Sequence, residues 1–320
     1  MTTRILEPGE IGQVDPFPAF VLPRESDLFA QRSRRFVHLA QGHPMATFLS
    51  AMAELTLAQQ TAFGARHAGP IALTLLEQSR LHGMPPLSYQ PTLRDAEWQV
   101  DLAAIMTALA AQPTASWQDA VVALRAMSAH QCDALAEAVL LGADSALPLH
   151  ALLVPLVGAA LQVWWSRQAG ALQDADIGHV GSATVCPICA SRPVASVVEI
   201  SANQASLRYL HCALCSTQWH MVRVTCSSCE STGGIAYFSL NGAQQDTAPS
   251  RKIAFARAET CDGCHSYLKI FTREKDPLME ANADDLATLA LDLLVDQAGY
   301  LRSGPNLLFH PGVIAEAPAT

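Results

Sequence analysis

The sequence CPICASRPVASVVEI at residues 186–200 opens a segment that holds eight of the nine cysteines of the chain. These eight form four Cys-x-x-Cys pairs between residues 186 and 264, whereas the preceding residues have the pattern of helices. A single Cys-x-x-Cys pair is ambiguous, because redox enzymes and metal sites both use it. Four pairs separated by strand-like segments indicate two metal sites, each with four thiolate ligands.

Short strand-like segments connect the cysteine pairs. Residues 194–200 and 207–210 are expected to form one hairpin, and residues 235–240 and 252–257 a second one. Each hairpin would bring two consecutive pairs together. Site 1 then contains Cys186, Cys189, Cys212 and Cys215, and site 2 contains Cys226, Cys229, Cys261 and Cys264. The alternative joins the two middle pairs, Cys212/Cys215 and Cys226/Cys229, in one site.

The two residues inside each pair let the backbone wrap around one metal ion, with amide N–H groups directed at the sulfurs. Four thiolates complete a tetrahedron, which leaves no position for a substrate and argues against metal catalysis. No Ser-His-Asp set is evident in the sequence. His211, His220 and His265 lie near cysteines, but we expect them to support the sites or face solvent, because eight thiolates fill both tetrahedra.

Other functions fit the four cysteine pairs less well than two metal sites. A thioredoxin-like redox motif normally has one pair in a βαβ context. An iron–sulfur cluster would also accept four thiolates. Two Cys-x-x-Cys turns (knuckles) joined by a hairpin instead favour a site with a single metal ion. A zinc ribbon that binds nucleic acid remains an alternative, although thiolate-bound metals would make residues 180–276 negative. The metals would in any case stabilise small modules that have little core of their own.

Composition sets further bounds on function. Half of the 320 residues are apolar, which excludes a disordered chain, and the formal charge of −9 gives no broad basic surface for nucleic acid. The first residues lack the apolar core of a signal peptide, so we expect a cytoplasmic protein with reduced thiols. The apolar run at residues 147–165 contains two prolines, and a buried helix is favoured over a membrane span.

The first half of the sequence predicts an all-α region after an extended, proline-rich arm at residues 1–25. The expected helices begin near residue 28 and then cover residues 45–64, 70–82, 95–110, 117–127, 132–141 and 146–168. Arg32, Arg34 and Arg35 are interpreted as a solvated helix face, with contact to an acidic partner as the alternative. Cys132 is interpreted as a buried apolar residue rather than a nucleophile.

The C-terminal part predicts one more helix. Asp284 and Asp285 are placed at its N-terminal end, where acidic side chains suit the helix dipole, and Gly299 ends it. Residues 307–309, Leu-Leu-Phe, are expected to dock on the body of the protein.

The cysteine-bearing segments resemble one known family. The stretches CPICASRPVASVVEI at 186–200, LRYLHCALCSTQWHMVRVTCSSCE at 207–230 and ETCDGCHSYLKIF at 259–271 are similar to the FdhE family of formate dehydrogenase accessory proteins. The resemblance continues through residues 274–306. It covers the whole length but is specific from about residue 186 onward.

This resemblance implies a fold and a function. We expect a multidomain α+β protein, with an all-α half at residues 1–180, a rubredoxin-like (zinc-ribbon-like) metal-binding module at 181–223, and a second module with a C-terminal helix at 224–320. The family implies a non-enzymatic cytoplasmic protein that helps to mature respiratory formate dehydrogenase by contacting its catalytic subunit. Iron is the implied metal, and zinc stays open because both accept four thiolates. The alternative function is rubredoxin-like electron transfer.

Overall fold

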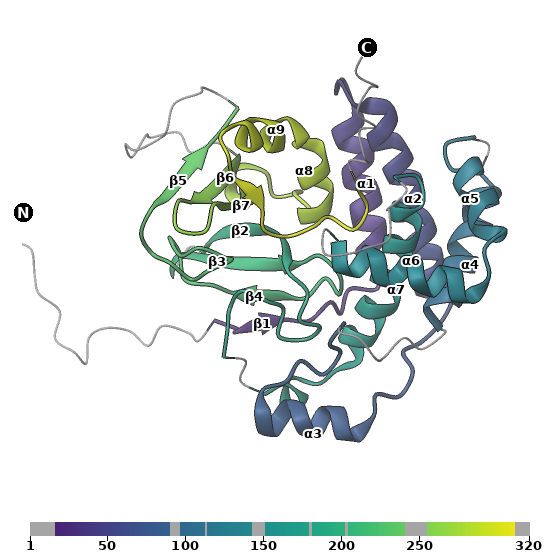
Figure 1. The fold of residues 1–320 in the computed structure, drawn as a ribbon, viewed down its shortest axis with the longest axis horizontal. Coiled ribbons are helices and arrows are strands. Elements are labelled where there is room, and N and C mark those ends of the chain that lie inside the picture. The colour runs from purple at the N-terminus through teal and green to yellow at the C-terminus, as the bar shows by residue number, and fades with distance from the viewer. Residues whose placement is uncertain are drawn as a thin grey trace, which may run out of the picture.

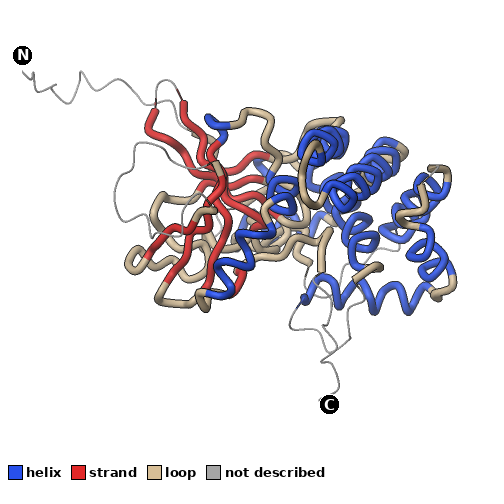
Figure 2. Tube along the Cα trace, turned by 90° about the horizontal axis from the view of Figure 1, so that it is seen from above, coloured by secondary structure: helices blue, strands red, loops and turns tan. Residues whose placement is uncertain are grey.

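The computed structural model describes residues 17–89, 97–112, 114–142, 151–178, 181–201, 204–240 and 255–310. Strands gather at one end of the molecule and most helices at the other, as Figure 2 shows. The fold is therefore the mixed helix and sheet arrangement that the sequence predicts, with a helical N-terminal half. The residue boundaries 180/181 and 223/224 between domains stay a prediction.

The helices of the first half are close to those expected. They are α1 (Leu28–Ala40), α2 (Ala46–Gly64), α3 (Leu73–His82), α4 (Glu97–Ala110), α5 (Gln118–Arg125), α6 (Ala129–Leu141) and α7 (Val154–Ala171). Trp98, Leu102, Ile105 and Leu109 of α4 are all buried, as their 3.6-residue period predicts. Cys132 of α6 is also buried.

Helix α7 is the centre of the helical half. Every residue from 154 to 169 is buried, because α2, α4 and α6 pack around it. The predicted apolar run begins at residue 147, and its first four residues lie outside the described ranges. Within those ranges, no helix combines the length and hydropathy that a membrane span needs. A buried core helix explains the same apolar sequence.

The strands form a single sheet that includes both predicted hairpins. Its members are β1 (Phe20–Val21), β2 (Pro193–Ser201), β3 (Gln204–Cys212), β4 (Gln218–His220), β5 (Ile235–Phe238), β6 (Ala256–Cys261), β7 (Ser266–Thr272) and β8 (Leu301–Arg302). The order is β1-β4-β3-β2-β7-β6-β5, and β8 pairs with β7. The first hairpin is β2–β3 and the second is β5–β6, as drawn in Figure 1.

Strand β7 joins the two hairpins, and it is not among the strands expected from the sequence. It pairs antiparallel with β6 and parallel with β2, where Ser196 faces Ile270 and Val198 faces Thr272. The return strand of the second hairpin, expected at 252–257, is instead β6; residues 251–254 lie outside the described ranges. The β-branched and aromatic content of SYLKIFT was the signal available for β7.

The N-terminal arm is more than an extension of the helical half. Its strand β1 pairs with β4, with Phe20 opposite Trp219, so the arm adds an edge strand to the sheet. Leu22 is buried in the same core as the helices and site 1. Residues 1–16 of the predicted arm lie outside the described ranges.

The C-terminal helix is two helices, which corrects the single helix expected from residue 284. Helix α8 (Ala281–Ala287) begins at the N-cap Glu280, whose carboxylate accepts a hydrogen bond from the Ala283 N–H, and α9 (Leu289–Gln297) follows a break at Thr288. Asp284 lies in the first turn of α8, as expected, and its carboxylate accepts a hydrogen bond from the Glu280 N–H; both Asp284 and Asp285 are buried. Helix α8 lies between β2 and α1 (Figure 1).

The arginines of α1 correct a second expectation, that of a solvated basic face. Arg32 is buried and donates to Glu280 and Gln162. Arg35 is buried and forms two hydrogen bonds with Asp284, of 2.9 and 2.6 Å. Arg34 alone is exposed. The local sequence does not indicate this burial, because the acidic partners of Arg32 and Arg35 lie about 250 residues later in the chain.

The C-terminal segment docks on α7 as expected. Leu307 and Leu308 are buried, and the backbone of Leu307 lies directly against Gly158 of α7. A Cβ at position 158 would overlap the Leu307 carbonyl, so only glycine allows this approach.

We expect Gly158→Ala to lower the free energy of unfolding by about 1–3 kcal/mol, because the overpacked methyl must displace backbone. Urea unfolding measures the loss. The matched control is Gly64→Ala, where nothing lies within 4 Å of the added Cβ and about 0.5 kcal/mol of stabilisation is expected. Equal effects of the two substitutions would show that residue 307 does not dock at this position.

Candidate metal centres

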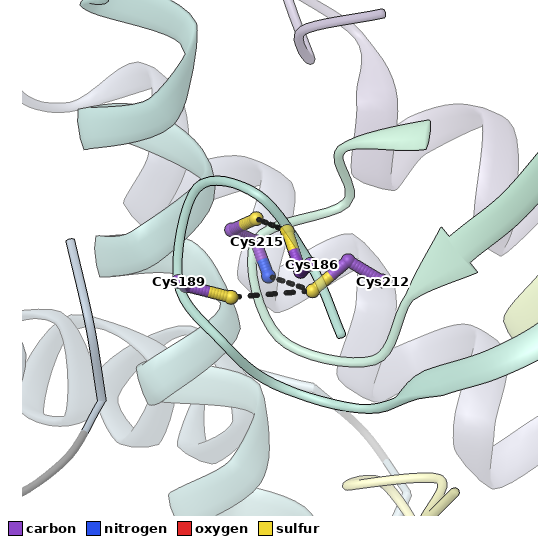
Figure 3. A group of neighbouring side chains, drawn as sticks. All are labelled: Cys186, Cys189, Cys212 and Cys215. Carbon is purple, nitrogen blue, oxygen red and sulfur yellow. Dashed lines mark hydrogen bonds between the residues drawn. The ribbon is translucent and has the colours of Figure 1, made fainter. Parts of the chain in front are cut away.

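The eight cysteines that the sequence predicts as metal ligands lie in two groups of four. The sulfurs of Cys186, Cys189, Cys212 and Cys215 lie within 4.8 Å of one another, and so do those of Cys226, Cys229, Cys261 and Cys264. The groups follow the chain order, and the alternative pairing of the two middle motifs is not formed. Figure 3 shows the four side chains of site 1 pointing at a common centre. Metal binding by these residues stays a prediction.

The sulfur positions fit a tetrahedral metal ion. A tetrahedron with metal–sulfur bonds of about 2.3 Å needs sulfurs about 3.8 Å apart, whereas a disulfide needs about 2.05 Å. The Cys186–Cys215 and Cys189–Cys212 sulfurs are 3.5 and 3.4 Å apart, and the Cys226–Cys264 and Cys229–Cys261 sulfurs are 3.6 and 3.7 Å apart. The remaining pairs in each site lie within 4.8 Å. None of the eight cysteines forms a disulfide. Each group could therefore hold one ion after a small expansion.

Both sites are built by the same local plan. In each, the first pair precedes a hairpin and the second pair begins at its end, so Pro193 faces Cys212 and Ile235 faces Cys261. The residue after each pair has a positive φ of 53–62°, which turns the chain back over the sulfurs. These four residues are Ala190, Ser216, Glu230 and His265. A non-glycine residue rarely adopts this conformation, and its recurrence after every pair marks a structural requirement.

Hydrogen bonds to sulfur prepare one thiol in each site for ionisation. Burial opposes ionisation of Cys212, but the neighbouring thiols and the Cys215 N–H outweigh it and hold the pKa of Cys212 well below its ordinary value. In site 2, burial is likewise outweighed by Ser266 and the Cys229 and Cys226 thiols, which lower the pKa of Cys264 to about 7. A thiolate is the form that binds metal.

Site 1 is enclosed by the helical half of the chain. Its four cysteines are at most 1% exposed. The N–H groups of Leu87 and Tyr89 donate to the carbonyls of Ile188 and Cys189, and the Gln162 amide of α7 donates to the Ala213 carbonyl at 2.7 Å. Residues 87 and 89, which lie between the helices expected at 70–82 and 95–110, thus hold the first knuckle. A glutamine inside the apolar run was the signal for the second contact.

Site 2 is more open. Cys226 and Cys261 are buried, but Cys229 is exposed and Cys264 is half-buried. Site 2 therefore has the four ligands that the sequence predicts, but solvent reaches one of them. Tyr300, which precedes β8, covers one side by donating a hydrogen bond from its hydroxyl to Asp262 at 2.6 Å.

The neighbouring histidines are not part of either group. Within the described ranges, no other His, Cys, Asp or Glu side chains form a group of three or more with ligand atoms within 4.8 Å of one another. Burial, and then the charges of Arg273 and Arg32, lower the pKa of His211 to about 3, so its ring is neutral at neutral pH. Its Nε2 is buried without a hydrogen-bond partner among the described residues.

Comparison with protein families places matches along nearly the whole chain. The N-terminal part of FdhE matches residues 17–182, the FdhE central domain matches residues 185–223, and the FdhE C-terminal domain matches residues 224–309. The central match contains site 1 and the C-terminal match contains site 2.

Individual relatives agree with these matches. A protein FdhE homolog of Pseudomonas aeruginosa is 41% identical over 313 residues, covering 98% of this chain and 99% of that protein. The protein FdhE of Escherichia coli K12 is 34% identical over 321 residues, with the same coverage. The crystal structure of the FdhE protein from Pseudomonas aeruginosa superposes with a TM-score of 0.81 at 42% identity, covering 92% of this chain and all of that one.

Proposed function

The chain belongs to the FdhE family, and on this basis we propose that it is a non-enzymatic accessory protein for a respiratory formate dehydrogenase. In this proposal it acts in the cytoplasm, where it contacts the catalytic subunit during maturation. The observation that carries the proposal is the family match over nearly the full length together with two complete four-cysteine groups. Nucleic acid is not the proposed partner, because the net charge of −9 opposes phosphate binding.

We propose that each cysteine group holds one metal ion. Cys186, Cys189, Cys212 and Cys215 would ligate the first ion, and Cys226, Cys229, Cys261 and Cys264 the second. The ions would tie each hairpin end to its preceding knuckle and stabilise the fold. Iron is favoured by the resemblance to rubredoxin-like modules, and zinc fits the same ligands.

The ligand sets support a scaffold rather than an enzyme. Four thiolates fill a tetrahedron, so a substrate would have to displace a protein ligand before it could reach the metal. Site 1 is also buried in the core that contains α7 and β2. We therefore propose that the protein acts through its surface on another protein.

We expect the intact protein to copurify with the immature catalytic subunit of formate dehydrogenase from its own organism. If the protein acts during maturation, it should bind the subunit before its cofactor is inserted. The mature, cofactor-loaded enzyme is the matched control and should be retained less. Pull-down with the tagged full-length chain measures both. Failure to retain the immature subunit under anaerobic conditions would contradict the proposed partner.

Electron transfer is a second candidate function, favoured by the solvent exposure of Cys229 in site 2. It requires iron that changes oxidation state reversibly. A reversible thiolate-to-Fe(III) absorption band would support this candidate, and stoichiometric zinc without such a band would remove it.

A further inference from the structure

The two cysteine groups differ in what surrounds them. Site 1 shares the main hydrophobic core with the helices, and backbone or amide donors from two separate segments hold its knuckles. Site 2 is not part of that core, and its knuckle residues Glu230, Asp262 and Gly263 are exposed, although the Ala183 N–H donates to the Glu230 carboxylate. Reaching the metal position of site 1 requires opening the core, whereas site 2 needs no such opening.

Two cysteines of site 2 are accessible from outside the protein. Cys229 is exposed to solvent. Cys264 lines a pocket of about 460 Å³, together with Arg192, Ser228 and Ser266. The pocket is large enough to admit a side chain of another molecule, which can then approach the Cys264 sulfur.

Within site 2, Cys229 is the most exposed ligand. Cys261 is 1% exposed and Cys226 4%, and the sulfur of Cys226 accepts a hydrogen bond from the Ser228 N–H at 3.4 Å. Cys264 lies 3.0 Å from the Ser266 hydroxyl. The Cys229 sulfur accepts a hydrogen bond from the Ser231 N–H, so turning it toward solvent breaks that bond but opens no part of the main core.

We propose that the two centres divide their roles: site 1 is a permanent structural centre, and site 2 is an exchange site where Cys229 yields its position to a thiol from another molecule. In the exchange, the outside sulfur bonds to the metal as the bond to Cys229 breaks. The proton of the outside thiol passes to Cys229, and no electron is transferred. The inference rests on the proposed metal occupancy of both sites.

The test uses the full-length protein loaded with two zinc ions. A chromogenic chelator follows metal release, in the presence of a tripeptide with a central cysteine or of the same tripeptide with serine. We expect one ion to leave at least about tenfold faster than the other, because only site 1 must wait for core opening. The cysteine peptide should accelerate the fast phase in proportion to its concentration, and the serine peptide should not.

Brief alkylation with iodoacetamide, followed by mass spectrometry of the fragments, identifies the responding thiols in the same unmutated protein. Cys229 should be labelled first, and the site 1 cysteines only on unfolding. Three outcomes would overturn the division of roles but not the proposed metal occupancy. They are release of both ions at one rate, early labelling of Cys186 or Cys189, and equal effects of the two peptides. A protein that takes up no zinc would overturn the proposed metal occupancy as well.

Discussion

Replacing Cys186 with alanine is expected to unfold most of the chain. Loss of one thiolate leaves three ligands in a site whose cysteines are at most 1% exposed, within the core that α7 shares with β2. A structural thiolate site contributes on the order of 10 kcal/mol, which is comparable with the total stability of about 5–15 kcal/mol of ordinary domains. Circular dichroism, soluble yield and metal content of the variant measure the effect.

Two controls separate this effect from the loss of any buried sulfur. Cys132→Ala removes a buried thiol outside both groups and should cost about 1 kcal/mol without changing the metal content. Cys226→Ala should lose one ion and unfold the second hairpin first, because site 2 lies outside the main core. A Cys186→Ala or Cys226→Ala protein with full metal content and unchanged melting would contradict the assignment of ligands.

Replacing Asp284 with alanine is expected to destabilise the protein by about 3–5 kcal/mol, because it leaves the buried Arg35 guanidinium without its main partner. Both side chains are nearly inaccessible, at 3% and 1% exposure. Their pair joins α1 to α8, and α8 in turn contacts β2. Urea unfolding of the variant measures the loss.

The same helix provides the matched control. Arg34 pairs with Asp27 at 2.9 Å, but both side chains are largely exposed. Removing Asp27 should therefore cost only about 0.2–1 kcal/mol. The double variant Arg35→Met/Asp284→Leu should recover much of the loss, since a buried ion pair is replaceable by apolar packing. Similar losses for Asp27→Ala and Asp284→Ala would contradict the buried pair that links helices and sheet.

The cysteine groups were predictable because their spacing is local and repeated. Two residues between cysteines and a hairpin between pairs determine which sulfurs meet, and these patterns are visible in the sequence. The helices were predictable from apolar periodicity for the same reason. The apolar character of α7 indicated burial, although it did not show that Gln162 would contact site 1.

The long-range contacts were not predictable in this way. The arginines of α1 and the aspartates of α8 each have the pattern of solvated helix residues, and only the fold shows that Arg35 and Asp284 are partners. The parallel pairing of β2 with β7 likewise depends on how two hairpins meet. The difference in exposure between Cys229 and the site 1 cysteines follows from what α7 covers, which no spacing encodes.

Metal analysis of the anaerobically purified full-length protein, combined with its visible spectrum, shows whether the eight paired cysteines hold two metal ions. We expect two ions per chain, with thiolate-to-iron bands if the metal is iron and none if it is zinc. A folded protein that contains no bound metal, with its eight cysteines present as free thiols or disulfides, would contradict this expectation.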